Sequence, residues 1–161
     1  LEGHVIICGY GRTGERIGEF LHAEKIPFLA LDIDPHRIKR AAAAGGSVLF
    51  GNPDRTEVLQ AAGLKRARGI CIAYPDSRAA ARVVSAIRRA RQDIPIIVRA
   101  IDEGDVGRLI AAGATEVIPE VFEGGLLIAA ETLGQIGIPI ERAVEHVRIA
   151  RAAQRAKLTE G

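Results

Sequence analysis

Short apolar runs alternate along this chain with longer stretches in which charged residues recur at helical spacing. The runs are four or five residues long and rich in valine and isoleucine, which is typical of strands buried on both faces of a parallel sheet. The intervening stretches carry helix signals. Asp34-Pro35 offers a cap and a first-turn proline, and Asp76 or Ser77 can cap the run that ends at Arg91. The six predicted strands are 4–8, 27–31, 47–50, 69–73, 95–98 and 115–118.

Two more helix starts follow the same logic. Asp54 with Glu57 resembles a capping box, and Gly63 is the expected end of that helix. Asp102 can cap the run that ends at Gly113. Because a helix lies between consecutive strands, right-handed crossovers are expected. The pattern therefore predicts an α/β fold, a Rossmann-like doubly wound parallel six-stranded sheet in the order 3-2-1-4-5-6 with a C-terminal helical extension.

The pattern changes after the sixth predicted strand. Residues 120–134 lack strand signals and predict an apolar helix, residues 136–139 interrupt it, and residues 141–158 predict a second, more charged helix. The chain therefore divides into a six-strand unit at residues 1–119 and a helical extension at residues 120–161. The extension has no place in the six-strand unit, and we expect it to be a dimer element or a lever to another domain.

A glycine fingerprint, Gly9-Tyr10-Gly11-Arg12-Thr13-Gly14, follows the first predicted strand and opens a helix. In this context Gly9 permits the tight turn, Gly11 lets a phosphate approach the backbone, and Gly14 lets the helix pack closely on the sheet. The helix N-terminus adds N–H groups and a partial positive charge. Asp32 ends the second strand 18 positions after Gly14. A carboxylate there accepts ribose hydroxyls and repels a 2′-phosphate, which favours NAD or a plain adenine nucleotide over NADP.

The ends of the third and fourth strands should complete this crevice, because ligands of doubly wound sheets bind at the carboxyl ends of the strands. Gly51-Asn52-Pro53 borders the expected adenine pocket, where Asn52 either meets the base or only shapes the turn. Ala73 and Tyr74 lie across the switch point and line the far side. The predicted cofactor-binding residues are Gly9, Tyr10, Gly11, Arg12, Thr13, Gly14, Asp32, Ile33, Asp34, Arg37, Gly51, Asn52, Pro53, Ala73, Tyr74 and Arg99.

Several charged residues have two interpretations. Arg12 and Arg99 fall at strand ends that face the crevice, where either can neutralise phosphate or pair with a carboxylate such as Glu120. Asp34 is interpreted first as a helix cap and second as a ribose contact. Basic clusters, among them residues 37–40 and 88–91, are interpreted as solvated faces with favourable charges at helix C-termini.

The composition and the positions of a few residue types argue against several classes of function. The formal charge of +2 is too small for a dedicated nucleic-acid binder, and 4% aromatic residues without tryptophan leave almost no base-stacking platform. Cys8 and Cys71 lie in apolar runs and are interpreted as buried side chains, with no histidines spaced to complete a metal site. The Tyr-xxx-Lys pair of short-chain dehydrogenases is absent, because the residue four positions after Tyr74 is Arg78. The histidines are interpreted as packing or surface residues rather than as catalytic bases. We therefore predict a sensor rather than an enzyme.

The chain begins at Leu1 and contains no methionine. It has no basic and apolar leader, and no run approaches the roughly 18 apolar residues of a membrane-spanning helix. We expect a soluble domain that was processed or cut out of a longer protein.

The motifs, taken in order, resemble one family. They are the glycine fingerprint, Leu31-Asp32-Ile33-Asp34-Pro35, Gly51-Asn52-Pro53 and Ala61-Ala62-Gly63-Leu64. Over roughly residues 4–135 this series resembles the RCK N-terminal domain, also called TrkA-N or KTN. Val121-Phe122-Glu123-Gly124-Gly125-Leu126, followed by Glu131-Thr132-Leu133-Gly134, makes it most similar to the cytosolic domain of Kef-type potassium/proton antiporters of the monovalent cation:proton antiporter-2 group.

The resemblance implies a regulatory role. Domains of this family bind NAD(H) or an adenine nucleotide such as AMP or ATP, and they form a homodimer through a crossing helix. The expected partner is a membrane-embedded antiporter part in the same full-length chain, at the cytoplasmic face of the inner (plasma) membrane. Residues 1–119 would be the nucleotide-binding domain and residues 120–161 the crossover and lever. The glycine fingerprint would take phosphate, Asp32 the ribose, and Gly51 and Asn52 the base.

Other functions stay open at this point. A regulatory subunit of a Trk/Ktr-type potassium uptake system belongs to the same class. A minimal NAD-dependent oxidoreductase belongs to a different class, as does a dimerisation module with a degenerate site. A longer gene with transmembrane segments before Leu1 would separate the antiporter domain from the uptake subunit, and turnover of NADH with a carbonyl substrate would favour the oxidoreductase.

Overall fold

The computed structural model describes residues 1–160, with side-chain surroundings for residues 1–158. Its centre is one parallel sheet of six strands in the order β3-β2-β1-β4-β5-β6, which confirms the predicted fold class and strand order. The strands are β1 (Val5–Cys8), β2 (Phe28–Asp32), β3 (Ser47–Phe50), β4 (Gly69–Ile72), β5 (Ile96–Ala100) and β6 (Glu116–Pro119).

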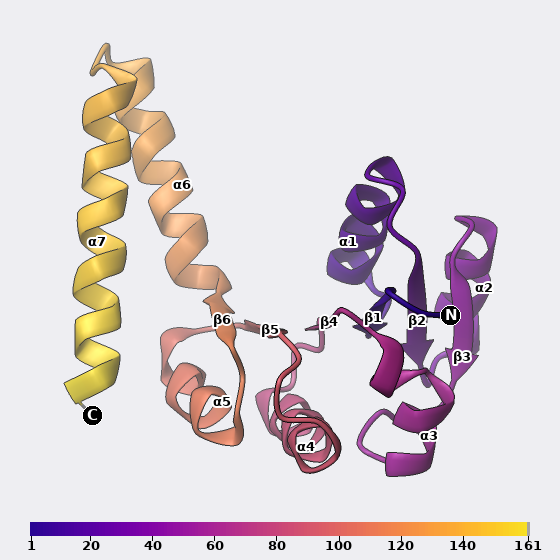
Figure 1. Ribbon diagram of the computed structural model, residues 1–161. Coiled ribbons are helices and arrows are strands. Elements are labelled where there is room, and N and C mark those ends of the chain that lie inside the picture. Colours follow the sequence, from indigo (N-terminus) through magenta and orange to yellow (C-terminus); the bar gives the residue numbers. More distant parts are fainter. Residues whose placement is uncertain (161) are drawn as a thin grey trace.

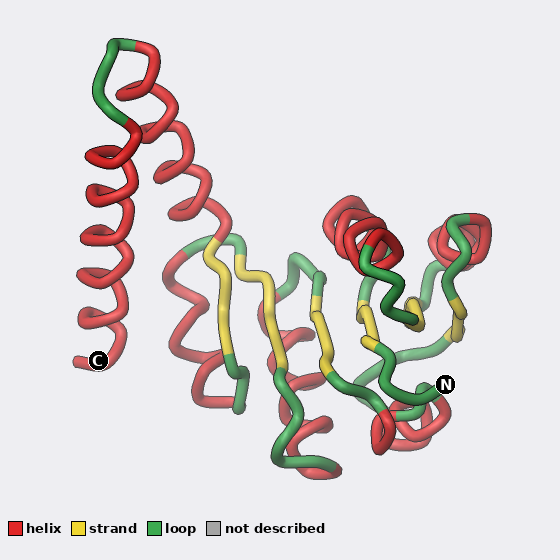
Figure 2. The backbone as a smooth tube through the Cα atoms, turned by 45° about the horizontal axis from the view of Figure 1, so that its top comes forward, coloured by secondary structure: helices red, strands yellow, loops and turns green. Residues whose placement is uncertain are grey.

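Helices cover the two faces of the sheet unequally. Figure 1 and Figure 2 show α1 and α2 on one face and α3, α4 and α5 on the other. The large hydrophobic core lies under the second group, and a smaller one, which contains Tyr10 and Phe28, lies under the first. The helices are α1 (Arg12–Ala23), α2 (Pro35–Ala43), α3 (Thr56–Ala61), α4 (Ser77–Ala90), α5 (Val106–Ala112), α6 (Glu120–Gln135) and α7 (Ile140–Glu160), with short 3-10 turns at Leu64–Arg66 and Glu103–Asp105.

Burial on both faces, predicted for all six strands, is wrong for β3, β5 and β6. The strands β1 and β2, which α1 and α2 cover on one face, are almost entirely buried. In β3 the two end residues, Ser47 and Phe50, are exposed. On the half of the sheet that α1 and α2 do not cover, Ile97 and Ile118 are 36% and 39% exposed. These strands are apolar enough for the interior of a sheet. They are exposed nevertheless, because they lie at an edge or on the part of one face that α1 and α2 do not cover.

Two predicted helix starts are confirmed and two are corrected. The Asp34 carboxylate accepts the N–H of His36 at 2.9 Å, and that of Asp76 accepts the N–H of Arg78 at 2.9 Å, as caps do. The capping box at Asp54 is wrong, because α3 starts one residue later and has no side-chain cap. Asp102 caps the preceding 3-10 turn instead of α5.

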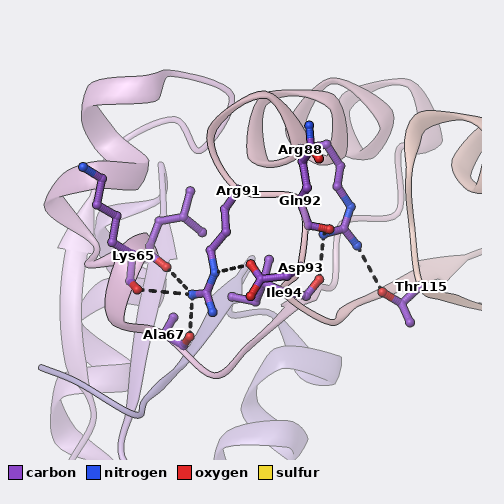
Figure 3. Close-up of polar contacts among 9 residues, drawn as sticks. Lys65, Ala67, Arg88, Arg91, Gln92, Asp93, Ile94 and Thr115 are labelled. Carbon is purple, nitrogen blue, oxygen red and sulfur yellow. Dashed lines mark hydrogen bonds and ion pairs between the residues drawn. The ribbon is translucent and has the colours of Figure 1, made fainter.

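Arginines near the end of α4 are structural, so the solvated interpretation of residues 88–91 is wrong for two of them. Figure 3 shows the Arg88 and Arg91 guanidinium groups turned toward loops at the amino ends of the strands. Arg88 donates to the carbonyls of Ile94 at 2.7 Å and Gly113 at 2.8 Å. Arg91 donates to the carbonyls of Leu64 and Ala67 at 2.8 and 2.7 Å. Both side chains thus tie the end of α4 to backbone carbonyls at the amino ends of the strands.

The last two helices form a hairpin that projects beyond the sheet, and only the C-terminal part of α7 returns to it, where Leu158 packs against the large core and Arg155 lies 3.7 Å from Glu116 of β6. Figure 1 shows α6 rising from the end of β6 and α7 returning beside it, after a turn at Gly137 with φ +93°. No residue of α6 is buried, and Leu127 and Ile128 are 69% and 70% exposed. Among the described residues no helix is long and apolar enough to cross a membrane.

Candidate functional site

The glycine fingerprint forms the turn between β1 and α1, at the carboxyl edge of the sheet. Gly9 has φ +92°, a conformation that side chains other than glycine's rarely adopt. A Cβ on Gly14 would stand 2.1 Å from the Gly9 carbonyl oxygen, so the helix can approach the turn only with glycine there. Gly11 precedes the first residue of α1 and provides no side-chain cap, so the N–H groups of the first turn remain for an anion.

Asp32 ties this turn to the end of β2. Its side chain is fully buried, and one carboxylate oxygen accepts the Tyr10 N–H at 2.7 Å. The other oxygen accepts the Asp34 N–H at 2.9 Å. An ionised carboxylate has about four acceptor positions, so each oxygen keeps one for a ribose hydroxyl. The predicted ribose acceptor is therefore also the group that holds the glycine turn in shape.

Tyr10 contributes to the turn through its backbone alone. Its ring is 1% exposed and stacks on Phe28 with the ring centroids 6.2 Å apart, beneath α1. Its N–H is used by Asp32, and its carbonyl accepts a hydrogen bond from Arg40 at 3.2 Å. Its predicted phosphate contact therefore has no side-chain basis in this structure.

A rim of cations surrounds a cavity of about 560 Å³ beside the glycine turn. The Arg37 guanidinium carbon lies 3.8 Å from the position that a Cβ on Gly11 would take. The same side chain, 43% exposed, is 3.8 Å from carboxylate oxygens of both Asp32 and Asp34. The arrangement concentrates positive charge where a phosphate would approach the helix N-terminus. The cavity is lined by Gly11, Arg12, Asp34, His36, Arg37, Lys39 and Arg40.

Sequence reasoning placed two of these cations, Arg12 and Arg37, in the site and missed Lys39 and Arg40. The missed residues were interpreted as part of a solvated face. A usable signal existed, because Arg37 and Arg40 are three positions apart in α2 and therefore share one side of the helix.

The third strand end shapes one wall of the crevice. Gly51 donates its N–H to the Asp32 carbonyl at 3.0 Å, and a Cβ on Gly51 would stand 3.1 Å from Val58. The Asn52 side-chain oxygen accepts the Asp54 N–H at 3.1 Å. Asn52 thus shapes the turn in this structure, and its amide nitrogen is the group left to meet a base. The neighbouring Pro53 is buried, whereas Ile33 on the β2 side is 59% exposed.

Tyr74 covers the glycine turn from the fourth strand end. Two of its ring carbons lie 3.0 and 3.1 Å from the position of a Cβ on Gly9. Burial raises the pKa of the Tyr74 hydroxyl, and the nearby Cys8, Asp32 and Asp54 raise it further. The hydroxyl therefore stays protonated at neutral pH and has a proton to donate. Burial likewise raises the pKa of the Cys8 thiol, as expected of an inert core residue.

Arg99 connects the site to α6. It donates to the carbonyl of Ala73 at 3.0 Å, and its guanidinium forms a two-pronged ion pair with Glu120, the first residue of α6. Of the two roles predicted for Arg99, the structure thus contains the carboxylate pair. Arg12, in contrast, is exposed at the start of α1 and lines the cationic cavity.

The family model of the TrkA-N domain matches residues 5–120. The chain belongs to the TrkA-N domain family. This TrkA-N domain is 38% identical to the putative K(+) efflux antiporter KefB of Alkalimonas amylolytica over 142 residues, which are 88% of this chain and 22% of KefB. The predicted likeness to Kef-type antiporters is confirmed.

Two solved structures match this TrkA-N domain at 28% identity. The Kef CTD of Shewanella denitrificans, in AMP-bound form, has a TM-score of 0.83 and covers 98% of this chain and 96% of its own. The TrkA-N domain of the inner membrane protein ybaL from Escherichia coli has a TM-score of 0.76 and covers 80% of this chain and 95% of its own. The first likeness extends through the helical pair, since it covers nearly the whole chain.

Proposed function

We propose that this TrkA-N domain is an adenine-nucleotide sensor, of the NAD(H) or AMP type, that regulates a potassium/proton antiporter from the cytoplasmic face of the membrane. One observation carries the proposal: a glycine turn fixed by the buried Asp32 lies beneath a rim of arginines. That arrangement suits a phosphate joined to a ribose. The AMP-bound form of the Shewanella relative supports the nucleotide class, and the name of the Alkalimonas relative supports the transporter class.

The described residues suggest how a nucleotide would be held. The phosphate would meet the N–H groups at the start of α1 and the guanidinium groups of Arg12 and Arg37. The ribose hydroxyls would bind Asp32. The base would lie toward Gly51 and Asn52. Each contact pairs a charged or polar ligand group with a protein group of the opposite kind, so the ligand needs both a phosphate and a nucleoside.

Sensing rather than catalysis follows from what surrounds the turn. The Tyr74 hydroxyl beside the turn has a pKa raised by burial, so it stays protonated and does not act as a base. The arginines of the rim are permanently charged, so they bind anions and do not accept protons. We therefore propose a domain that changes its conformational equilibrium on binding and leaves the nucleotide unaltered.

Arg99 offers the route by which occupancy would reach the antiporter. It joins the Ala73 carbonyl at the rim of the crevice to Glu120 at the base of α6. A nucleotide that moves the β4–α4 turn would therefore change the contact that sets the direction of α6. Such a shift is limited by the difference in affinity of the nucleotide for the two orientations.

The helical pair provides the proposed second partner, another copy of the chain. Leu127 and Ile128 on α6, and Ile136 and Ile140 at the hairpin tip, are about 70% exposed, from 69% to 71%. Apolar side chains clustered on one element indicate an interaction surface. We propose that residues 120–161 form a homodimer crossover and lever, attached to the nucleotide-binding domain at residues 1–119.

A ligand panel tests the sensor. AMP, ADP, ATP, NAD, NADH and NADP are each added to the domain, and the unfolding midpoint is measured. At 100 times its Kd, a specific ligand stabilises by about 2.7 kcal/mol, which shifts the midpoint by roughly 5–10 °C in a domain of this size. We expect this response to at least one adenine nucleotide. No response to any of the six contradicts the proposal.

A pair of glycine variants locates the binding site. Gly11→Val should abolish the response, because the added side chain fills the space between the turn and Arg37. Gly107→Val is the matched control, since Gly107 also lies at a helix start and nothing lies within 4 Å of its Cβ position. An unchanged response in Gly11→Val would place the nucleotide elsewhere.

A further inference from the structure

The Tyr74 side chain is buried more deeply at its tip than at its base. As a residue it is only partly buried, and its ring packs against the large core and against Gly9. Its hydroxyl oxygen is fully buried and has no hydrogen-bond partner among the described residues. The polar end of the side chain therefore points into the protein, between the glycine turn and the neighbouring strand ends.

An unpartnered buried hydroxyl is costly. Leaving such a group without a hydrogen bond costs about 1–3 kcal/mol, and most buried polar atoms in proteins avoid this. A phenylalanine would fill nearly the same volume without that cost. The hydroxyl thus gains no hydrogen bond from the described residues, and its position beside the glycine turn favours a ligand as the acceptor.

The surroundings of the hydroxyl identify which part of the crevice it faces. The Tyr74 ring carbons lie 3.0 and 3.1 Å from the Cβ position of Gly9, and the Gly9 N–H donates to the carbonyl of Leu31, next to Asp32. Burial is the main cause of the raised pKa of the hydroxyl, and Cys8, Asp32 and Asp54 raise it further, which agrees with a place beside the ends of β1, β2 and β3. These strand ends carry the proposed ribose acceptor Asp32 and the base-side turn at Gly51, so the hydroxyl belongs with the half of the crevice that would hold adenosine.

Arg37 lies over the carboxylate side of the crevice. This side chain is 43% exposed and is 3.8 Å from each of the carboxylates of Asp32 and Asp34. Neither distance is that of a hydrogen bond, so an arriving phosphate can offer the guanidinium a closer, charge-assisted partner. Movement of Arg37 toward the phosphate would leave the Asp32 carboxylate free to accept a ribose hydroxyl.

We infer that Tyr74 is a specificity-determining residue whose hydroxyl donates a hydrogen bond to the adenosine half of the bound nucleotide while its ring remains as a wall over Gly9. This inference rests on the proposed nucleotide function. It gives the hydroxyl a hydrogen-bond acceptor, which the described residues do not provide. The contact lies on the part that AMP and NAD share, so both nucleotides should use it.

Tyr74→Phe tests the inference with two measurements on the same variant. Titration calorimetry with AMP and with NAD should show affinity weakened by about 3- to 10-fold for both, the loss of one hydrogen bond. Unfolding without nucleotide should show a midpoint equal to or above that of the wild type, because the unpartnered hydroxyl is gone. A purely structural tyrosine would not combine unchanged or higher stability with weaker binding.

Thr115→Val is the matched control. The Thr115 hydroxyl accepts hydrogen bonds from the Ile96 N–H at 3.0 Å and from Arg88 at 3.1 Å, at the opposite end of the sheet. Its removal should lower the unfolding midpoint and leave the affinity for AMP unchanged. The inference is overturned if wild type binds AMP and Tyr74→Phe binds it equally well, if only NAD binding weakens, or if Tyr74→Ala binds AMP more tightly than wild type. Failure of the wild type to bind any nucleotide overturns the proposed function instead.

Discussion

Removal of the Asp32 carboxylate should destabilise the domain even without a ligand. Its two oxygens accept the N–H groups of Tyr10 and Asp34 at 2.7 and 2.9 Å in a fully buried position. Asp32→Ala leaves both donors unpaired, and each costs about 1–3 kcal/mol. We expect a loss of roughly 2–6 kcal/mol, which lowers the unfolding midpoint by about 4–24 °C.

A graded series makes this prediction sharper. Asp32→Asn keeps one side-chain oxygen and therefore one acceptor, so the expected loss is about half that of Asp32→Ala. Asp93→Asn is the control, because the Asp93 side chain is 79% exposed and its partner Arg91 keeps its bonds to the Leu64 and Ala67 carbonyls. The stability of this variant should change by less than about 0.5 kcal/mol. The assay is urea unfolding at neutral pH. An Asp32→Ala variant as stable as wild type would refute the role of Asp32 in holding the glycine turn.

Three further predictions test the rest of the molecule. Arg99→Ala removes the group between Ala73 and Glu120, so any AMP-dependent change in hydrogen exchange at the start of α6 should disappear while AMP still binds. Leu127→Glu should shift a homodimer to monomer in sedimentation, whereas Gln135→Glu should not. Burial raises the pKa of the Cys8 thiol above 9.0, so the unfolded chain releases this proton first and stability should fall above about pH 9; Cys8→Ala should reduce that slope.

The strand order and the glycine turn could be predicted because both depend on local sequence. Runs rich in isoleucine and valine that alternate with helices are compatible with few folds other than a doubly wound sheet. The fingerprint at residues 9–14 requires glycines for reasons of space, and the 2.1 Å approach at Gly14 shows how strict that requirement is. The acidic end of β2 follows from the same motif, and Asp32 takes that place.

Long-range partners could not be predicted in the same way. Arg88 and Arg91 look like any basic pair at a helix end, and only the fold brings loop carbonyls within 3 Å of them. The exposed faces of Ile97 and Ile118 likewise depend on how far the α1 and α2 layer extends. Tyr74 was predicted to line the crevice, but its unpartnered hydroxyl is visible only from the packing around it.

The measurement that tests the central claim most directly is a calorimetric titration of the domain with AMP. The arrangement of the glycine turn, Asp32 and the arginine rim predicts saturable binding of one AMP per chain. It also predicts that Gly11→Val abolishes this binding and Gly107→Val preserves it. Absence of saturable heat in the wild type, or equal binding by Gly11→Val, would contradict the account.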